Sequence, residues 1–357
     1  MTFAVNIAQS GSNNQTMRNR IINGAMTIDQ RNNGASLVLS GGQYTLDRWL
    51  GIRVGGTSTL TVQQSTVAPA GFTNSYLVTA GSGATPSGTE ERSLNTRIEG
   101  FNVADLGWGT ANAQPVTLSF WVRSSVTGTF GVVLGNSAFN RSFVTSYTVN
   151  AANTFEYKTI TVAGDTSGTW LTNNGIGLSI YWDLGVGTTY SGSATGAWQG
   201  SGFEGLTGGA KLSATSGATW YITGVQLEEG TAASPFENRL YGQELALCQR
   251  YFISYGGQQT FEPYGTGTVL TSTRTAVQLG LPVPMRTPPA MTVVSPTSFT
   301  VNDGGSSIQA TSLSLDTAGF QQIMYNADVA SGLTVGRGVR VFSSGTLVTR
   351  IQLSSEL

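Results

Sequence analysis

Residues Pro115 to Arg123 read PVTLSFWVR, and apolar and polar side chains alternate along this stretch. If the stretch is a strand, one of its faces carries Val116, Leu118, Phe120 and Val122. A period of two residues is typical of a β-strand with one face in a core. The same alternation recurs at 155–162, 176–184 and 219–229, with glycine-bearing turns between the runs. The pattern predicts short antiparallel strands over residues 19–232, arranged as a β-sandwich of jelly-roll type.

A second β region follows residue 254. Alternation resumes at 273–284, and FTVNDGGSSIQATSLSL (299–315) reads as two strands joined by a turn at Asp303 to Gly305. We therefore expect an all-β fold in four parts. These are an N-terminal attachment arm (1–18), a jelly-roll β-sandwich (19–232), a linking helix (233–253) and a smaller C-terminal β-sandwich (254–357).

Between the two β regions the period changes. Residues 234–252 read SPFENRLYGQELALCQRYF. Ser234 and Glu237 have the spacing of a capping box, and Pro235 suits the first position of a helix. Four residues then follow at helical spacing and form one stripe: Tyr241, Leu245, Cys248 and Phe252. We predict that this stripe packs between domains or against the same helix in other subunits of a trimer.

The composition narrows the classes of function. Only 10% of the 357 residues are charged, against about 25% in an ordinary soluble domain. The net charge is −1, and no cationic stripe is present, so we expect no nucleic-acid partner. No run approaches ~18 consecutive apolar residues, so we expect no membrane insertion.

Two residue types limit the chemistry. The chain contains no histidine, which excludes Ser-His-Asp and Cys-His catalysis and zinc sites built on histidine. Cys248 is its one cysteine, so no intrachain disulfide forms. The adjacent pairs Glu90-Glu91 and Glu228-Glu229 point to opposite faces if they lie on strands, so a catalytic carboxylate pair would need distant residues. We predict no enzyme activity, no catalytic residue, no cofactor and no metal site.

One long segment is a candidate binding site. Residues 183–209 are rich in Gly and Ser and carry the rings of Tyr190, Trp198 and Phe203. A loop of this length is often functional, and aromatic rings stack on the C–H faces of sugars. These three residues are our candidates for glycan contact. The alternative is that their rings anchor the loop or pack against a neighbouring subunit.

Other residues have simpler interpretations. Four tryptophans lie within or beside strand patterns, and we expect them to pack in the core or between sheets: Trp49, Trp121, Trp182 and Trp220. Asp105 and Asp183 have oxygen ligands that suit Ca²⁺, but no spacing typical of a calcium loop accompanies them.

Three segments together resemble a group of tail-fibre-like proteins from phages and prophages. They are NRIINGAMTIDQRNNG (19–34) followed by YTLDRW (44–49), SFWVRSSVTGTFGV (119–132) and ITGVQLEEGTAASPFENRLYGQELALCQRYF (222–252). The first domain also resembles the jelly-roll carbohydrate-binding modules of glycan-degrading enzymes. The resemblance implies a virion structural protein, often a trimeric fibre whose distal part touches glycan on the host surface. It transfers no binding residue to this chain.

The expected function is therefore that of a homotrimeric phage tail fibre or receptor-binding protein. The N-terminal segment would attach to other tail or baseplate proteins of the virion, and the trimer would bind host cell-surface glycan with avidity. A head decoration, head fibre or baseplate protein without receptor contact is the alternative. A tailspike depolymerase is a third reading.

Overall fold

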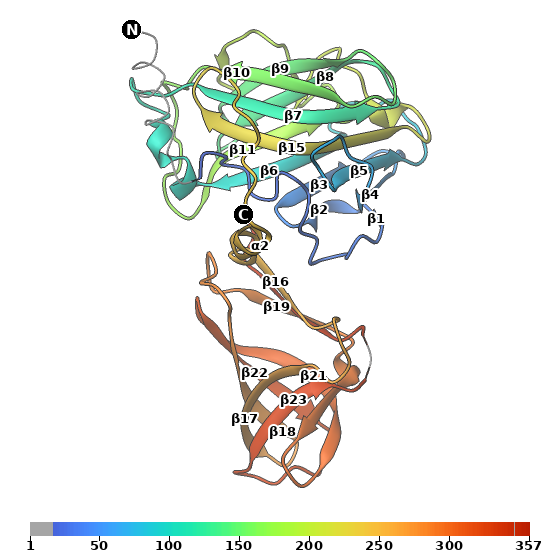
Figure 1. Ribbon diagram of the computed structural model, residues 1–357, viewed down its shortest axis with the longest axis vertical. Helices are drawn as coiled ribbons and strands as arrows, with labels where there is room; N and C mark the ends of the chain where they lie inside the picture. The colour runs from blue at the N-terminus through green and yellow to red at the C-terminus, as the bar shows by residue number, and fades with distance from the viewer. Residues whose placement is uncertain (1–16, 346) are drawn as a thin grey trace. The chain divides into compact units, whose positions relative to one another are not determined.

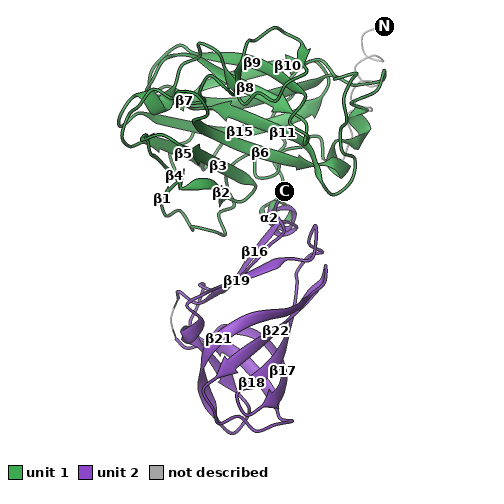
Figure 2. Ribbon diagram, turned by 180° about the vertical axis from the view of Figure 1, so that it is seen from behind, with its two compact units in different colours: residues 1–244, 357 green, residues 245–356 purple. Residues whose placement is uncertain are grey.

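The computed structural model describes residues 17–345 and 347–357, so the expected attachment arm (1–18) lies almost entirely outside the described residues. The chain divides into two compact units (Figures 1 and 2). The first consists of residues 1–244 and Leu357, and the second of residues 245–356. The division falls inside the segment 233–253, which we expected to be the linking helix. The predicted all-β class is confirmed.

The first unit contains two antiparallel sheets. The six-stranded sheet has the order β1 (Leu37–Val38), β4 (Leu60–Ser65), β5 (Ser75–Ala80), β15 (Thr219–Glu229), β7 (Val116–Ser124), β10 (Glu156–Val162). The seven-stranded sheet has the order β13 (Trp198–Gln199), β9 (Ser142–Val149), β8 (Gly128–Gly135), β11 (Ile176–Asp183), β6 (Glu91–Glu99), β3 (Trp49–Val54), β2 (Gly41–Leu46). Two further short strands of this unit, β12 (Ser191–Gly192) and β14 (Gly205–Leu206), pair in parallel. The unit also contains three 3₁₀ helices: η1 (Gly100–Asn102), η2 (Ala104–Leu106) and η3 (Leu212–Ala214). A fourth, η4 (Pro296–Ser298), lies in the second unit.

The main core lies between these two sheets, and the predicted alternation accounts for it. Val116, Leu118, Phe120 and Val122 of β7 are fully buried there. On β11, Leu178, Ile180 and Trp182 occupy the same core, but the register shifts between Ile176 and Leu178 and leaves Ile176 on the outer face.

Three of the four strand tryptophans are core residues as expected: Trp49, Trp182 and Trp220. The prediction is wrong for Trp121. Its position on β7 is in phase with Thr117 and Ser119, so it lies half-buried on the outer face of the six-stranded sheet. Its ring contacts Tyr157 there, with 5.3 Å between ring centroids.

The helix begins later than the capping pattern predicts. Helix α2 spans Tyr241–Gln249, and residues 234–240 are not helical. The capping prediction fails because Ser234 and Glu237 bond to distant partners: Ser234 Oγ donates to Glu228 Oε2 (2.5 Å), and Glu237 Oε2 accepts from Asn19 N (2.5 Å). No helix in the described part of the chain is long and apolar enough to cross a membrane.

In the second unit six strands close into a barrel around a separate core, where we expected a sandwich of two sheets. Closure pairs β17 with both β18 and β23, which leaves the barrel sheet without an edge. The barrel order is β17 (Pro263–Thr271), β18 (Arg274–Gly280), β22 (Gln322–Val329), β21 (Ser307–Ala318), β20 (Phe299–Asn302), β23 (Gly338–Ser343). A three-stranded sheet accompanies it, with the order β16 (Phe252–Tyr255), β24 (Arg350–Ser354), β19 (Ala290–Val294).

Candidate functional site

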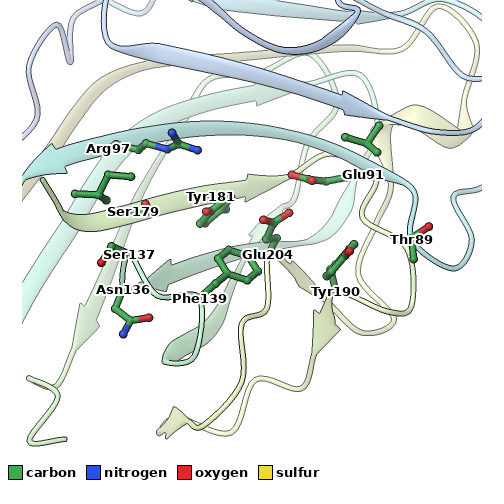
Figure 3. Close-up of a pocket in the computed structure, with 12 residues that line it drawn as sticks. Thr89, Glu91, Arg97, Asn136, Ser137, Phe139, Ser179, Tyr181, Tyr190 and Glu204 are labelled. Atoms are coloured by element: carbon green, nitrogen blue, oxygen red, sulfur yellow. The ribbon is translucent and has the colours of Figure 1, made fainter. Parts of the chain in front are cut away.

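A groove of about 620 Å³ lies on the outer face of the seven-stranded sheet (Figure 3). Its floor comes from β6 and β11, and its walls come from the β8–β9 connection and from the long segment after β11. It is lined by Val54, Thr89, Glu91, Arg97, Asn136, Ser137, Phe139, Ile176, Ser179, Tyr181, Tyr190 and Glu204.

Strand alternation places the floor residues. On β6, Leu94 and Ile98 point into the core, so Glu91 and Arg97 point outward. Asn95 lies between them on the same strand face and pairs in register with Tyr181 of β11. It is fully buried, and both polar atoms of its amide lack a hydrogen-bond partner among the described residues.

The wall formed by residues 184–211 is held by one carboxylate. Asp183 is fully buried at the end of β11 and accepts hydrogen bonds from the backbone N–H groups of Val186 (2.9 Å) and Leu206 (2.9 Å). It also forms an ion pair with Lys211. Burial raises the pKa of Asp183, and Lys211 acts in the opposite direction. This cluster fixes both ends of the segment against the sheet.

Two acidic side chains lie together in the groove. Glu204 is 8% exposed, and Figure 3 shows its carboxyl beside Glu91 and Tyr181. Burial, followed by a hydrogen bond and the negative charge of Glu91, raises the pKa of Glu204 to about 10. Glu204 is therefore protonated at neutral pH, and its Oε2 has no hydrogen-bond partner within the described chain. Arg97 donates to the Leu357 carbonyl oxygen (2.6 Å).

The three predicted glycan residues do not share one surface. Tyr190 lines the groove, beside Glu204. Phe203 is half-buried and packs on the small apolar cluster under the wall, over Gly192, where a Cβ would come within 2.5 Å of its ring.

Trp198 packs in a cluster of rings. Its centroid lies 5.2 Å from that of Trp108, 5.2 Å from that of Trp170 and 5.5 Å from that of Phe143. Its Nε1 donates to the Ala163 carbonyl oxygen at 2.7 Å. This placement fits the alternative interpretation of Trp198, in which the ring anchors the loop.

The remaining candidates are dispersed. Asp105 pairs with Arg20 (2.5 Å), away from Asp183, so the two carboxylates form no common site. Of the predicted helical stripe, Tyr241 is 65% exposed, Leu245 is half-buried, and Cys248 and Phe252 are buried. Phe252 begins strand β16, so it does not continue the stripe of the helix.

Sequence reasoning missed most of the groove. Glu91 was weighed within a neighbouring pair, but its partner Glu204 follows much later in the chain and meets it only through the fold. Arg97 and Tyr181 lie on strands whose outer faces carry polar residues in phase with them. Both alternate with the core residues Leu94 and Ile180 along their strands, and this alternation was the available signal that they face outward.

No family model matches this sequence, and no curated protein is similar to it. Several solved structures are similar to parts of it. The enzymatically active domain of tailspike protein 4 from bacteriophage CBA120 is 11% identical over 60% of this chain and 22% of that chain, with a TM-score of 0.30. The family 11 carbohydrate-binding module from Clostridium thermocellum, in complex with a β-1,3-1,4-mixed-linked tetrasaccharide, is 12% identical over 56% and 98% of the two chains, with a TM-score of 0.28.

TmCBM61 in complex with β-1,4-galactotriose is 9% identical, covering 60% of this chain and 99% of its own, with a TM-score of 0.28. The similar structures therefore include a phage tailspike domain and carbohydrate-binding modules. At these TM-scores the similarity carries no argument about the ligand, and the sandwich is described by its own strand order.

Proposed function

We propose that this chain is a glycan-binding structural protein of a phage virion, a trimeric tail fibre or receptor-binding protein that adheres to glycan on the host surface. The observation that carries the glycan-binding part is the groove on the seven-stranded sheet. The virion role rests on the three sequence segments that resemble tail-fibre-like proteins.

The groove combines the two kinds of surface that a sugar chain requires. The rings of Phe139 and Tyr190 offer apolar faces beside the buried Tyr181, and Asn136 and Glu204 offer polar atoms. Ligand sites of this kind are concave, with a few polar groups that fix orientation. The unpartnered Oε2 of Glu204 would gain a hydrogen bond from a sugar hydroxyl, which offsets the cost of its burial.

The carboxyl pair favours binding over cleavage. A glycosidase holds its two carboxyl groups about 5 Å apart, or roughly 6.5–9.5 Å when it inverts. Glu91 and Glu204 lie beside each other in the groove, and burial together with the nearby Glu91 raises the pKa of Glu204. We propose that two carboxyl groups so close together bind a sugar rather than cleave it, because they leave no space for a scissile bond between them.

Trimer formation would convert weak contacts into useful adhesion. Three copies of a shallow site, presented together, bind a surface of repeated glycans with far higher avidity than one copy. The N-terminal segment would attach the trimer to other virion proteins.

The test is binding of the purified full-length protein to a glycan array that includes host surface polysaccharide, with Tyr190→Ala as the groove variant. We expect the wild type to bind a subset of glycans, and Tyr190→Ala to weaken binding roughly tenfold, because one aromatic face is lost. Tyr241→Phe is the matched control, since Tyr241 is exposed and away from the groove.

Absence of binding by the wild-type protein would contradict the proposal, as would equal binding by Tyr190→Ala. New reducing ends after incubation with the polysaccharide would contradict the non-enzymatic reading. Light scattering of the same sample measures the number of subunits.

A further inference from the structure

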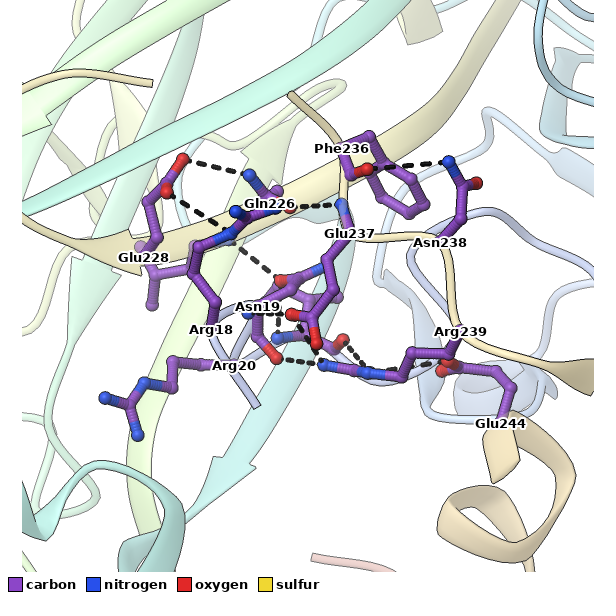
Figure 4. A network of polar contacts seen from close by, with 12 residues as sticks. Arg18, Asn19, Arg20, Gln226, Glu228, Phe236, Glu237, Asn238, Arg239 and Glu244 are labelled. Carbon is purple, nitrogen blue, oxygen red and sulfur yellow. Dashed lines mark hydrogen bonds and ion pairs between the residues drawn. The ribbon is translucent and has the colours of Figure 1, made fainter. Parts of the chain in front are cut away.

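On the face of the six-stranded sheet opposite to the groove, the outward-facing side chains of β15 are bonded to Arg18 and to the segment that follows the strand. We call residues 230–240 the strap, and Figure 4 shows its residues Phe236 to Arg239 beside Gln226 and Glu228 of β15. The strap is bonded to the outward-facing side chains of β15: Ser234 N donates to Glu228 Oε1 (2.8 Å), and Glu237 N donates to Gln226 Oε1 (2.8 Å). Phe236 packs edge-on against Phe72, with centroids 5.1 Å apart.

Beyond the strap the same face carries aromatic rings. Trp121 of β7 lies beside Tyr157 of β10, which is 43% exposed. Tyr221 of β15 lies beside Phe155, with ring centroids 6.2 Å apart. We call these four residues and Arg123 the ring platform. Its members come from three neighbouring strands and from the residue just before β10, and strand registers bring them together: Trp121 opposes Tyr157, and Arg123 opposes Tyr221.

Arg123 is the charged residue of the ring platform. Its Cζ lies 5.1 Å from the centroid of the Tyr221 ring and 6.0 Å from that of Phe155. Within residues 17–345 and 347–357 it forms no ion pair and no hydrogen bond, and its Nε is buried without a partner. Only its two terminal Nη groups are therefore open to a ligand, side by side and held in place by the rings.

We propose that the ring platform is a second binding site, independent of the groove, that takes an acidic saccharide with a carboxylate group. The two Nη groups bind the carboxylate in a bidentate manner, and the rings of Trp121 and Tyr157 contact the C–H faces of the adjoining sugar units. The unpaired charge decides the class of ligand, because a neutral glycan leaves the guanidinium without a counter-charge. A second copy of the chain is a poorer occupant, since only 19 of its 357 residues are acidic.

The experiment is calorimetric titration of the full-length protein at low salt with a short oligogalacturonate, and with a neutral galactose oligomer of equal length. We expect the acidic oligomer to bind and the neutral one not to bind at this site. Arg123→Gln should weaken binding at least about tenfold. Arg123→Lys should weaken it less, because lysine keeps the positive charge but cannot bind the carboxylate in a bidentate manner. Tyr157→Ala should weaken binding about threefold.

Arg340→Gln is the control, because Arg340 is an exposed arginine over a single ring, that of Phe342 at 5.4 Å, whereas Arg123 is half-buried beside two rings. It should bind like the wild type. Tyr190→Ala should also retain the acidic oligomer, which separates failure of this site from failure of the groove. Melting temperatures of all variants identify any loss of fold, and Arg123→Lys keeps the test valid if Arg123→Gln is unstable.

Three results would overturn the proposal. They are a wild-type protein that does not bind the acidic oligomer, an Arg123→Gln variant that binds it normally, and equal losses in Arg123→Gln and Arg340→Gln. Dissociation of an oligomer on Arg123→Gln substitution would also overturn it and assign the platform to a second copy of the chain.

Discussion

The two outer faces of the sandwich arise from the same alternation of side chains, yet they differ in shape and charge. The seven-stranded sheet is covered by residues 184–211, which wall a groove and bury Glu91 and Glu204 beneath it. On the six-stranded sheet the strap and Arg18 are bonded to the outward-facing side chains of β15, and β7 and β10 present rings around Arg123. The difference shows that the segments laid over a sheet, more than its strands, decide what each face can bind.

The largest effect is expected from removing the cation that holds the groove wall. Lys211→Ala leaves Asp183 buried without its counter-charge, so it should lower the free energy of unfolding by about 3–5 kcal/mol. Chemical denaturation measures the change. Lys158→Ala is the control on the other sheet, because its partner Glu156 is only half-buried, whereas Asp183 is fully buried. An equal loss of stability in Lys158→Ala would mean that the ion pair of Asp183 is no more important to the fold than the ion pair of Glu156.

Trp198→Ala should have the next largest effect. It removes one ring from the cluster with Trp108 and Trp170, and should cost about 2–4 kcal/mol of stability. Thermal unfolding followed by circular dichroism measures the loss. If the variant kept wild-type stability and lost only glycan binding, Trp198 would be a ligand contact and the site would extend to the end of the sheet.

Glu204→Gln tests the protonated carboxyl in the groove. The folded-state pKa of about 10 lies above the ordinary value of 4.5, so between these values the folded protein binds a proton that the unfolded chain has lost. The stability that this proton contributes is complete below about pH 4.5 and is lost as the pH rises toward 10. The variant should therefore be more stable than the wild type at pH 9, by at least about 1 kcal/mol.

The advantage of Glu204→Gln should disappear near pH 4.5, and melting temperatures across this range measure it. Glu262→Gln is the control, since it changes an acid of the second unit outside the groove. An advantage that did not depend on pH would mean that Glu204 is ionised in the folded protein.

The smallest effect is expected on the ring platform. Tyr157→Ala should change stability by no more than about 0.5 kcal/mol, because the ring is largely exposed at the edge strand β10. Denaturant titration provides the measurement. A loss above 2 kcal/mol would mean that the platform supports the fold, which would weaken its assignment as a binding surface.

Local periodicity was sufficient to predict β7, β10, β11 and β15 and the core face of β7, because the alternation of neighbouring side chains shows which face of a strand is buried. It did not predict the register shift that puts Ile176 on the outer face of β11. It was not sufficient for the helix start. Ser234 and Glu237 have the right spacing for a cap, but stronger partners reach them from β15 and from Asn19. No local pattern records such distant partners.

The groove was hidden from the sequence for the same reason. Glu91 and Glu204 are brought together by the pairing of β6 with β11 and by the return of the chain after β11. For Trp198 the sequence left both packing and binding open, because an aromatic residue in a Gly-rich segment suits both. Only the convergence of Trp108 and Trp170 from other loops distinguishes them.

The strap has a mechanical consequence. The start of the described chain and the exit from the sandwich are joined: Glu237 and Glu244 accept from the backbone N–H groups of Asn19 and Asn23, and Arg239 donates to the carbonyl oxygens of Asn19 and Ile21 (Figure 4). A pull on the chain ahead of Arg18 is thus borne first by this cluster of parallel bonds. The load is shared between the strap and β15, because Asn19 and Arg20 also hydrogen-bond to Val225 and Leu227 of that strand. The seven-stranded sheet, which carries the groove, takes no part in these bonds.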